Sequence, residues 1–181
     1  MSDASRVTRR GLLRLAGGAL AASQVPGLRA AAAAPDLRFF TPDEYALADA
    51  LAEIVIPADA HSGGARAAGA ALYIDGRLAE AFTDEPRALW REGLRLIDAL
   101  AAREHGEAFV RLTAPQQVRL LERLAAAESK PGTAEERFFA ELKRRIIDAY
   151  YTSRIGIHDE LEYKGNVLLD EFAGIDVSQK R

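Results

Sequence analysis

The stretch Phe40-Thr41-Pro42-Asp43-Glu44-Tyr45 predicts the start of a helix and, with the residues after it, an all-α fold. Thr41 and Glu44 have the spacing of a capping box, in which each side chain binds the backbone N–H of the other residue. Pro42 suits the first helical position, because the N–H that proline lacks would have no partner there. We expect the helix to end at Pro57. The apolar residues between these limits recur at helical spacing and form one face: Leu47, Leu51, Ile54 and Val55.

Four more helices are expected from similar boundaries. They run over about residues 67–82, from Glu85-Pro86 to near Gly106, from the capping box at Thr113 to the turn at Lys130-Pro131-Gly132, and from Thr133 to about Tyr151. Apolar residues at helical spacing predict their core positions: Leu72, Tyr73, Leu78, Phe82, Leu89, Trp90, Leu94, Ile97, Leu100 (or Ala101), Val118, Leu121, Leu124, Phe138, Phe139, Leu142, Ile146 and Tyr150. No segment shows the alternation of a strand. We therefore predict a compact, irregular all-α bundle of about five helices, following an N-terminal signal segment, as a single domain over residues 36–181.

Residues 1–33 have the pattern of an export signal. Thr8-Arg9-Arg10-Gly11-Leu12-Leu13-Arg14 precedes a small-residue, weakly apolar stretch, and alanines suited to a signal peptidase follow at residues 30–34. The adjacent Arg9 and Arg10 indicate the twin-arginine (Tat) route, with the Tat translocon as a partner and the periplasm as the destination. An ordinary Sec signal with two neighbouring arginines is the alternative. The exact cleavage site within residues 30–34, and whether the signal is removed, stay open.

Composition excludes several functional classes. The chain has 24 basic and 27 acidic residues, and removal of residues 1–33 leaves 19 and 26, a net charge of −7. That balance argues against a nucleic-acid-binding surface. The chain has no cysteine, which excludes disulfides, covalently attached haem c, iron–sulfur clusters and thiolate zinc sites. We expect no catalytic residue and no cofactor site in this chain.

Two weak metal-ligand candidates leave a second function open. His61 follows Asp59 in a loop, and His158 and Glu162 would share a face if their segment were helical. Either group offers only one imidazole and carboxylates, which is a poor ligand set. The alternative function is therefore an independent periplasmic metal-binding protein or enzyme that uses Asp59 and His61, or His158 and Glu162.

The C-terminal segment is a candidate partner interface. Tyrosine is enriched in interface cores, and glycine allows another chain to approach closely. The candidate interface residues are Tyr151, Ser153, Gly156, Tyr163, Gly165 and Asn166. A structural interpretation is also open, in which Tyr150 completes a core face, Gly156 and Gly165 end helices, and Asn166 caps the next one.

The chain resembles the small subunit (subunit 3) of the gluconate 2-dehydrogenase family. The residues that carry the resemblance are Phe40-Thr41-Pro42-Asp43-Glu44, Ile54-Val55-Ile56-Pro57-Ala58-Asp59, Gly64-Ala65, Ala68-Gly69, Tyr151-Thr152-Ser153, Gly156-Ile157, Tyr163 and Gly165-Asn166. Each piece is a modest motif, whereas their order and spacing along one chain are fairly specific.

The resemblance implies a non-catalytic partner of a large flavoprotein. In such complexes a subunit of the glucose–methanol–choline (GMC) oxidoreductase type binds FAD and oxidises a sugar or sugar acid. A cytochrome c subunit with haem c often accepts the electrons, and the complex associates with the inner membrane. The small subunit carries the Tat signal, so that a large subunit without a signal is exported with it. The resemblance leaves open the substrate, the electron acceptor and the subunit stoichiometry.

Overall fold

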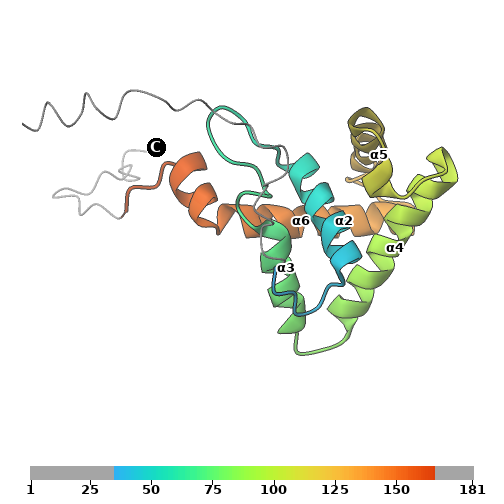
Figure 1. Cartoon of the computed structure of the whole chain (residues 1–181), viewed down its shortest axis with the longest axis horizontal. Helices are drawn as coiled ribbons and strands as arrows, with labels where there is room; N and C mark the ends of the chain where they lie inside the picture. Colours follow the sequence, from blue (N-terminus) through green and yellow to red (C-terminus); the bar gives the residue numbers. More distant parts are fainter. Residues whose placement is uncertain (1–34, 166–181) are drawn as a thin grey trace, which may run out of the picture. The chain divides into compact units, whose positions relative to one another are not determined.

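The computed structural model describes residues 35–165, which form an arrangement of helices without a strand in this range (Figure 1). The predicted signal at residues 1–33, with Arg9 and Arg10, lies outside the described residues, as does Asn166. Residues 35–165 contain five α-helices, together with a short 3₁₀-helix (Phe109–Arg111) and a π-helical turn (Gly156–Glu160): α2 (Pro42–Val55), α3 (Ala70–Ala79), α4 (Glu85–His105), α5 (Ala114–Ala126) and α6 (Ala134–Tyr151). The prediction of an all-α fold of about five helices is confirmed.

Capping boxes begin three of the helices. At α2, Thr41 Oγ1 accepts from the Glu44 N–H (3.2 Å), and the Glu44 carboxylate accepts from the Thr41 N–H (2.8 Å). At α5, the Gln116 side chain accepts from the Thr113 N–H (2.9 Å), which confirms the second predicted box. Thr133 forms the same arrangement at the start of α6. Each box satisfies N–H groups that the first turn of a helix leaves without partners.

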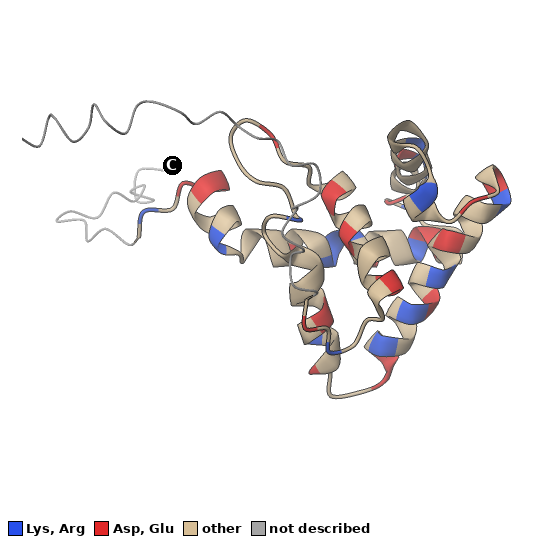
Figure 2. Cartoon of the chain, in the orientation of Figure 1, with Lys and Arg blue, Asp and Glu red and all other residues tan. Residues whose placement is uncertain are grey.

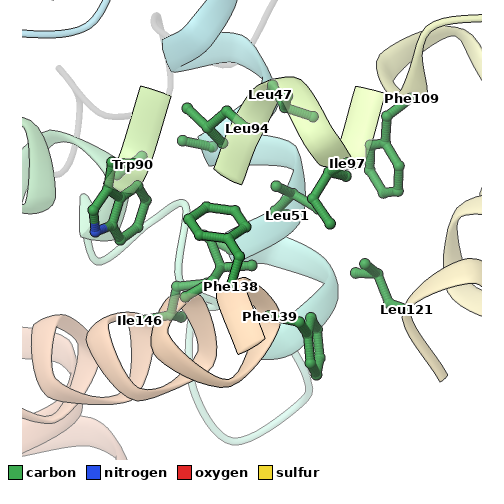
Figure 3. Close-up of a cluster of buried hydrophobic side chains, with 14 of the residues drawn as sticks. Leu47, Leu51, Trp90, Leu94, Ile97, Phe109, Leu121, Phe138, Phe139 and Ile146 are labelled. Atoms are coloured by element: carbon green, nitrogen blue, oxygen red, sulfur yellow. The ribbon is translucent and has the colours of Figure 1, made fainter. Parts of the chain in front are cut away.

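Helix α6 is the centre of the core, because it packs against α2, α3, α4 and α5. Its Phe138 ring meets the Trp90 ring of α4 edge to face, with 5.5 Å between the ring centroids (Figure 3). Such an aromatic pair contributes about 0.5–1.5 kcal/mol beyond the burial of its area. The five core positions predicted on α6 are all buried: Phe138, Phe139, Leu142, Ile146 and Tyr150.

Five predicted core residues are instead exposed, and those predictions were wrong. Their exposed fractions are 40% for Leu72, 42% for Tyr73, 102% for Phe82, 48% for Leu89 and 40% for Val118. Helix α3 is also shorter than expected. Gly69 precedes it in a left-handed conformation (φ 70°), which glycine adopts readily and which cannot belong to a helix, and the helix ends at Ala79, before Phe82.

One buried carboxylate holds the segment that leads into α2. Asp75 of α3 is fully buried, and it accepts the backbone N–H groups of Arg38 (2.7 Å), Phe39 (3.0 Å) and Phe40 (2.6 Å). The Arg91 guanidinium of α4 lies 4.7 Å from the centre of the Phe39 ring. A buried carboxyl group is tolerated where its oxygens are hydrogen-bonded, as they are here. Asp75 therefore fixes the first residues of the described fold to α3.

Candidate partner-binding segment

The candidate segment, residues 151–165, starts where α6 ends. The Tyr150 side chain, just before it, connects the end of α6 to the rest of the fold. Tyr150 is buried, and its hydroxyl lies 2.5 Å from Ser62 Oγ and donates to the Gly63 carbonyl (3.0 Å). These two bonds join the end of α6 to the loop that follows α2. A buried tyrosine hydroxyl needs such partners, because leaving it unpaired costs about 1–3 kcal/mol. The structural interpretation of Tyr150 as a core residue is confirmed.

The loop itself is held by Asp59. Its carboxylate accepts the backbone N–H groups of His61 (2.7 Å) and Ser62 (2.8 Å). The hydrogen bonds from Ser62 and then His61 lower the pKa of the Asp59 carboxyl below its usual value, because they favour the charged form. Asp59 thus shapes the turn that presents Ser62 to Tyr150.

Ser62 also connects this loop to the segment after α6. Its Oγ also lies 3.0 Å from a Glu160 carboxylate oxygen, and the neighbouring Gly63 lies against the Ile155 side chain. Sequence reasoning missed both Ser62 and Glu160. Ser62 is 88 residues from Tyr150 and 98 from Glu160, so no local pattern reports their contact.

Gly156 is required by close packing of the backbone. It is buried, and a Cβ atom at this position would collide with the Tyr150 carbonyl and with Tyr151 Cα. Its N–H donates to Ser153 Oγ (3.0 Å), and Gly156 is the first residue of the π-helical turn that lies beyond α6 in Figure 1. Gly156 and Ser153 therefore stabilise the backbone conformation of the segment. A direct role for them at an interface stays a prediction.

Three large aromatic or aliphatic side chains of this segment are exposed to solvent. The exposed fractions are 38% for Tyr151, 58% for Leu161 and 47% for Tyr163. The Tyr151 ring meets the Tyr150 ring edge to face at 5.2 Å. The Tyr163 N–H donates to the Ile157 carbonyl (3.0 Å), which folds the chain back after the π-helical turn. Gly165 follows with a φ of 98°. The segment thus presents three large apolar side chains on an ordered backbone.

The structure does not place His158 and Glu162 on one helical face. The π-helical turn ends at Glu160, and Glu162 adopts a left-handed conformation (φ 48°). Nδ1 of His158 lies 3.2 Å from the Tyr163 carbonyl oxygen. His158 and Glu162 both line an open hollow on the surface of the segment. His61 is exposed in its loop. Within residues 35–165, no group of three or more His, Asp or Glu side chains is placed to hold a metal ion.

Comparison with known proteins identifies one family. A family model described as gluconate 2-dehydrogenase subunit 3 matches residues 42–167, which is more than half of the chain. No curated protein matches significantly, and neither does any solved structure. In the described part of the chain, no helix is both long enough and apolar enough to cross a membrane.

Proposed function

The chain belongs to the gluconate 2-dehydrogenase subunit 3 family, and from this premise we propose that it is the non-catalytic small subunit of a periplasmic FAD-dependent dehydrogenase that oxidises a sugar or sugar acid. In this proposal, the chain stabilises a large GMC-type flavoprotein and carries the Tat signal for the export of both proteins. FAD is bound by the large subunit, and a cytochrome c subunit with haem c accepts the electrons. The complex associates with the inner membrane.

Family membership is the observation that carries the proposal, because it makes the chain an accessory subunit of an oxidoreductase complex. The sequence adds the Arg9-Arg10 pair, which is typical of proteins exported in the folded state. Such a signal suits a flavoprotein complex, since FAD must be inserted into a folded large subunit before export.

The segment from Tyr151 to Gly165 supports the proposed contact with the flavoprotein. It exposes Tyr151, Leu161 and Tyr163 on a backbone that Ser62 and Tyr150 hold in place. Aromatic side chains on an ordered backbone lose little conformational entropy on binding. Tyrosine is also among the residues that contribute most to interface energies.

Co-purification tests the proposal directly. The chain and the FAD-dependent flavoprotein are co-expressed with a tag on the flavoprotein, and the periplasmic fraction is purified through that tag. We expect the two proteins to elute together and the pair to oxidise sugars or sugar acids, whereas the chain alone shows no dehydrogenase activity. The proposal fails if the chain never co-purifies with the flavoprotein, or if the purified chain is itself active.

Tyr163→Ala is expected to weaken the complex by about 1–3 kcal/mol, the cost of truncating a buried interface aromatic. The dissociation constant measures this loss, and the melting temperature of the isolated chain is recorded beside it. Val110→Ala, at another exposed apolar residue, is the control and should leave the affinity unchanged. Unchanged affinity of the Tyr163 variant, or loss of the chain's own fold, would show that the residue is not an interface anchor.

A further inference from the structure

The turn between α3 and α4 presents the most exposed large apolar side chain of residues 35–165. Phe82 lies three residues after the end of α3, and its exposed fraction is 102%. A single exposed apolar residue is common on protein surfaces and needs no explanation by itself. At Phe82, two further features of the same turn indicate a binding surface.

The first feature is a set of hydrogen bonds from one arginine side chain that stabilises the turn. The Arg87 guanidinium of α4 donates to the carbonyl oxygens of Ala81 (3.0 Å) and Leu78 (3.4 Å), where α3 ends. It also bonds the Asp84 carboxylate at 2.6 Å, just before α4 begins. Arg87 therefore bonds the backbone before Phe82 and the Asp84 side chain after it. A side chain presented on an ordered turn binds a partner at a lower cost in conformational entropy.

The second feature is a pocket of about 210 Å³ beside Phe82. Its lining includes the apolar and aromatic residues Ile74, Leu78, Trp90, Tyr73 and Phe82. The charged residues that line this pocket, Arg77 and Arg145, are both basic. The pocket therefore suits an apolar side chain that has a carboxylate next to it.

Both arginines can receive a further carboxylate. Arg77 is 59% exposed and lies 3.7 Å from Glu80, while Arg145 Nε bonds Glu141 at 2.9 Å. A guanidinium has five N–H donors, so one ion pair leaves donors for a second acid. Figure 2 shows basic and acidic positions mixed along α4, whereas the charged residues that line the pocket are two arginines, each with one glutamate partner outside the lining. Aromatic residues and arginine are the types enriched at interface cores.

We propose that the corner formed by Tyr73, Arg77, Phe82 and Arg145 is a second contact surface for the flavoprotein, separate from the segment after α6. The occupant is a segment of the partner in which an apolar side chain enters the pocket and a neighbouring Asp or Glu binds Arg77 or Arg145. Phe82 packs on the partner beside this segment. This inference rests on the proposed function, because that function supplies the partner.

The test measures the affinity of the exported chain for the flavoprotein, with wild type, Phe82→Ala, Arg77→Glu and the control Val110→Ala. Phe82→Ala should weaken binding about 30-fold or more, the effect of an interface hot spot. Arg77→Glu should weaken binding most at low ionic strength, because salt screens exposed charges. Melting temperatures should stay at the wild-type value, since both side chains are exposed.

The outcomes separate this inference from the proposed function. If wild type binds and Phe82→Ala binds equally well, the second surface is wrong and the proposed function stands. If wild type does not bind the flavoprotein at all, the proposed function itself fails. Two further results would overturn the inference. In the first, Phe82→Ala abolishes binding to phosphatidylglycerol–phosphatidylethanolamine vesicles but leaves the affinity for the flavoprotein unchanged. In the second, it abolishes only self-association of the chain. Loss of affinity for the flavoprotein with an unchanged melting temperature supports it.

Discussion

Asp75→Ala is expected to lower the free energy of unfolding by about 3–5 kcal/mol, a large effect for one substitution. The substitution removes the acceptor of three backbone N–H groups, those of Arg38, Phe39 and Phe40. The Phe40 bond is buried, so its N–H would lose its partner without gaining water. Chemical denaturation of the exported chain measures the change.

Asp98→Ala is the matched control. Its carboxylate accepts one backbone N–H, that of Phe109 at 2.9 Å. We expect this variant to lose only about 1–2 kcal/mol, since one donor rather than three loses its acceptor. Equal losses for the two variants would contradict the role given to Asp75. On the proposed Tat route, which carries folded proteins, Asp75→Ala should also reduce export of the full chain.

Replacement of Arg9 and Arg10 together by lysine is expected to stop export of the chain and of its flavoprotein. Lysine keeps both positive charges, so a loss of export would show that the arginine pair is read as a motif and not only as basic charge. Immunoblots of periplasmic and cytoplasmic fractions measure both proteins.

Arg6→Lys with Arg14→Lys is the control for this variant, because it makes the same exchange on either side of the pair. We expect that control to be exported like wild type. Normal export of the Arg9 and Arg10 variant would instead assign the signal to another route. Equal export defects in the two variants would show that the pair has no special role.

Helix starts were predictable because their causes are local. Thr41 and Thr113 each bond a residue three positions later, so four letters of sequence contain the whole interaction. The core face of α6 was predictable for a related reason. This helix packs against α2, α3, α4 and α5, and its five predicted core positions are all buried.

Periodicity failed at residues near the edge of an apolar face or beyond the end of a helix. Leu89 precedes the buried Trp90 on α4, and Val118 lies on α5 near the buried Leu121, yet their exposed fractions are 48% and 40%. A spacing rule finds the direction of the apolar face but not its width. Phe82 fits the spacing of α3, but the helix ends before it.

Long-range polar contacts were not predictable at all. Asp75 looks like an ordinary surface aspartate in the sequence, and its partners lie 35 to 37 residues earlier. Ser62 looks like a loop residue, although it connects Tyr150 to Glu160. The candidate segment was found from its unusual composition, whereas the bonds that brace it depend on how α2 and α6 are placed.

The central claim is that this chain accompanies a signal-less flavoprotein to the periplasm and binds it there. The most direct measurement is the amount of FAD-loaded flavoprotein in the periplasmic fraction when it is expressed with and without this chain. We predict that the flavoprotein is periplasmic and active only in the presence of the chain, and that the two proteins co-purify. Equal amounts of active periplasmic flavoprotein in both cultures would contradict the claim.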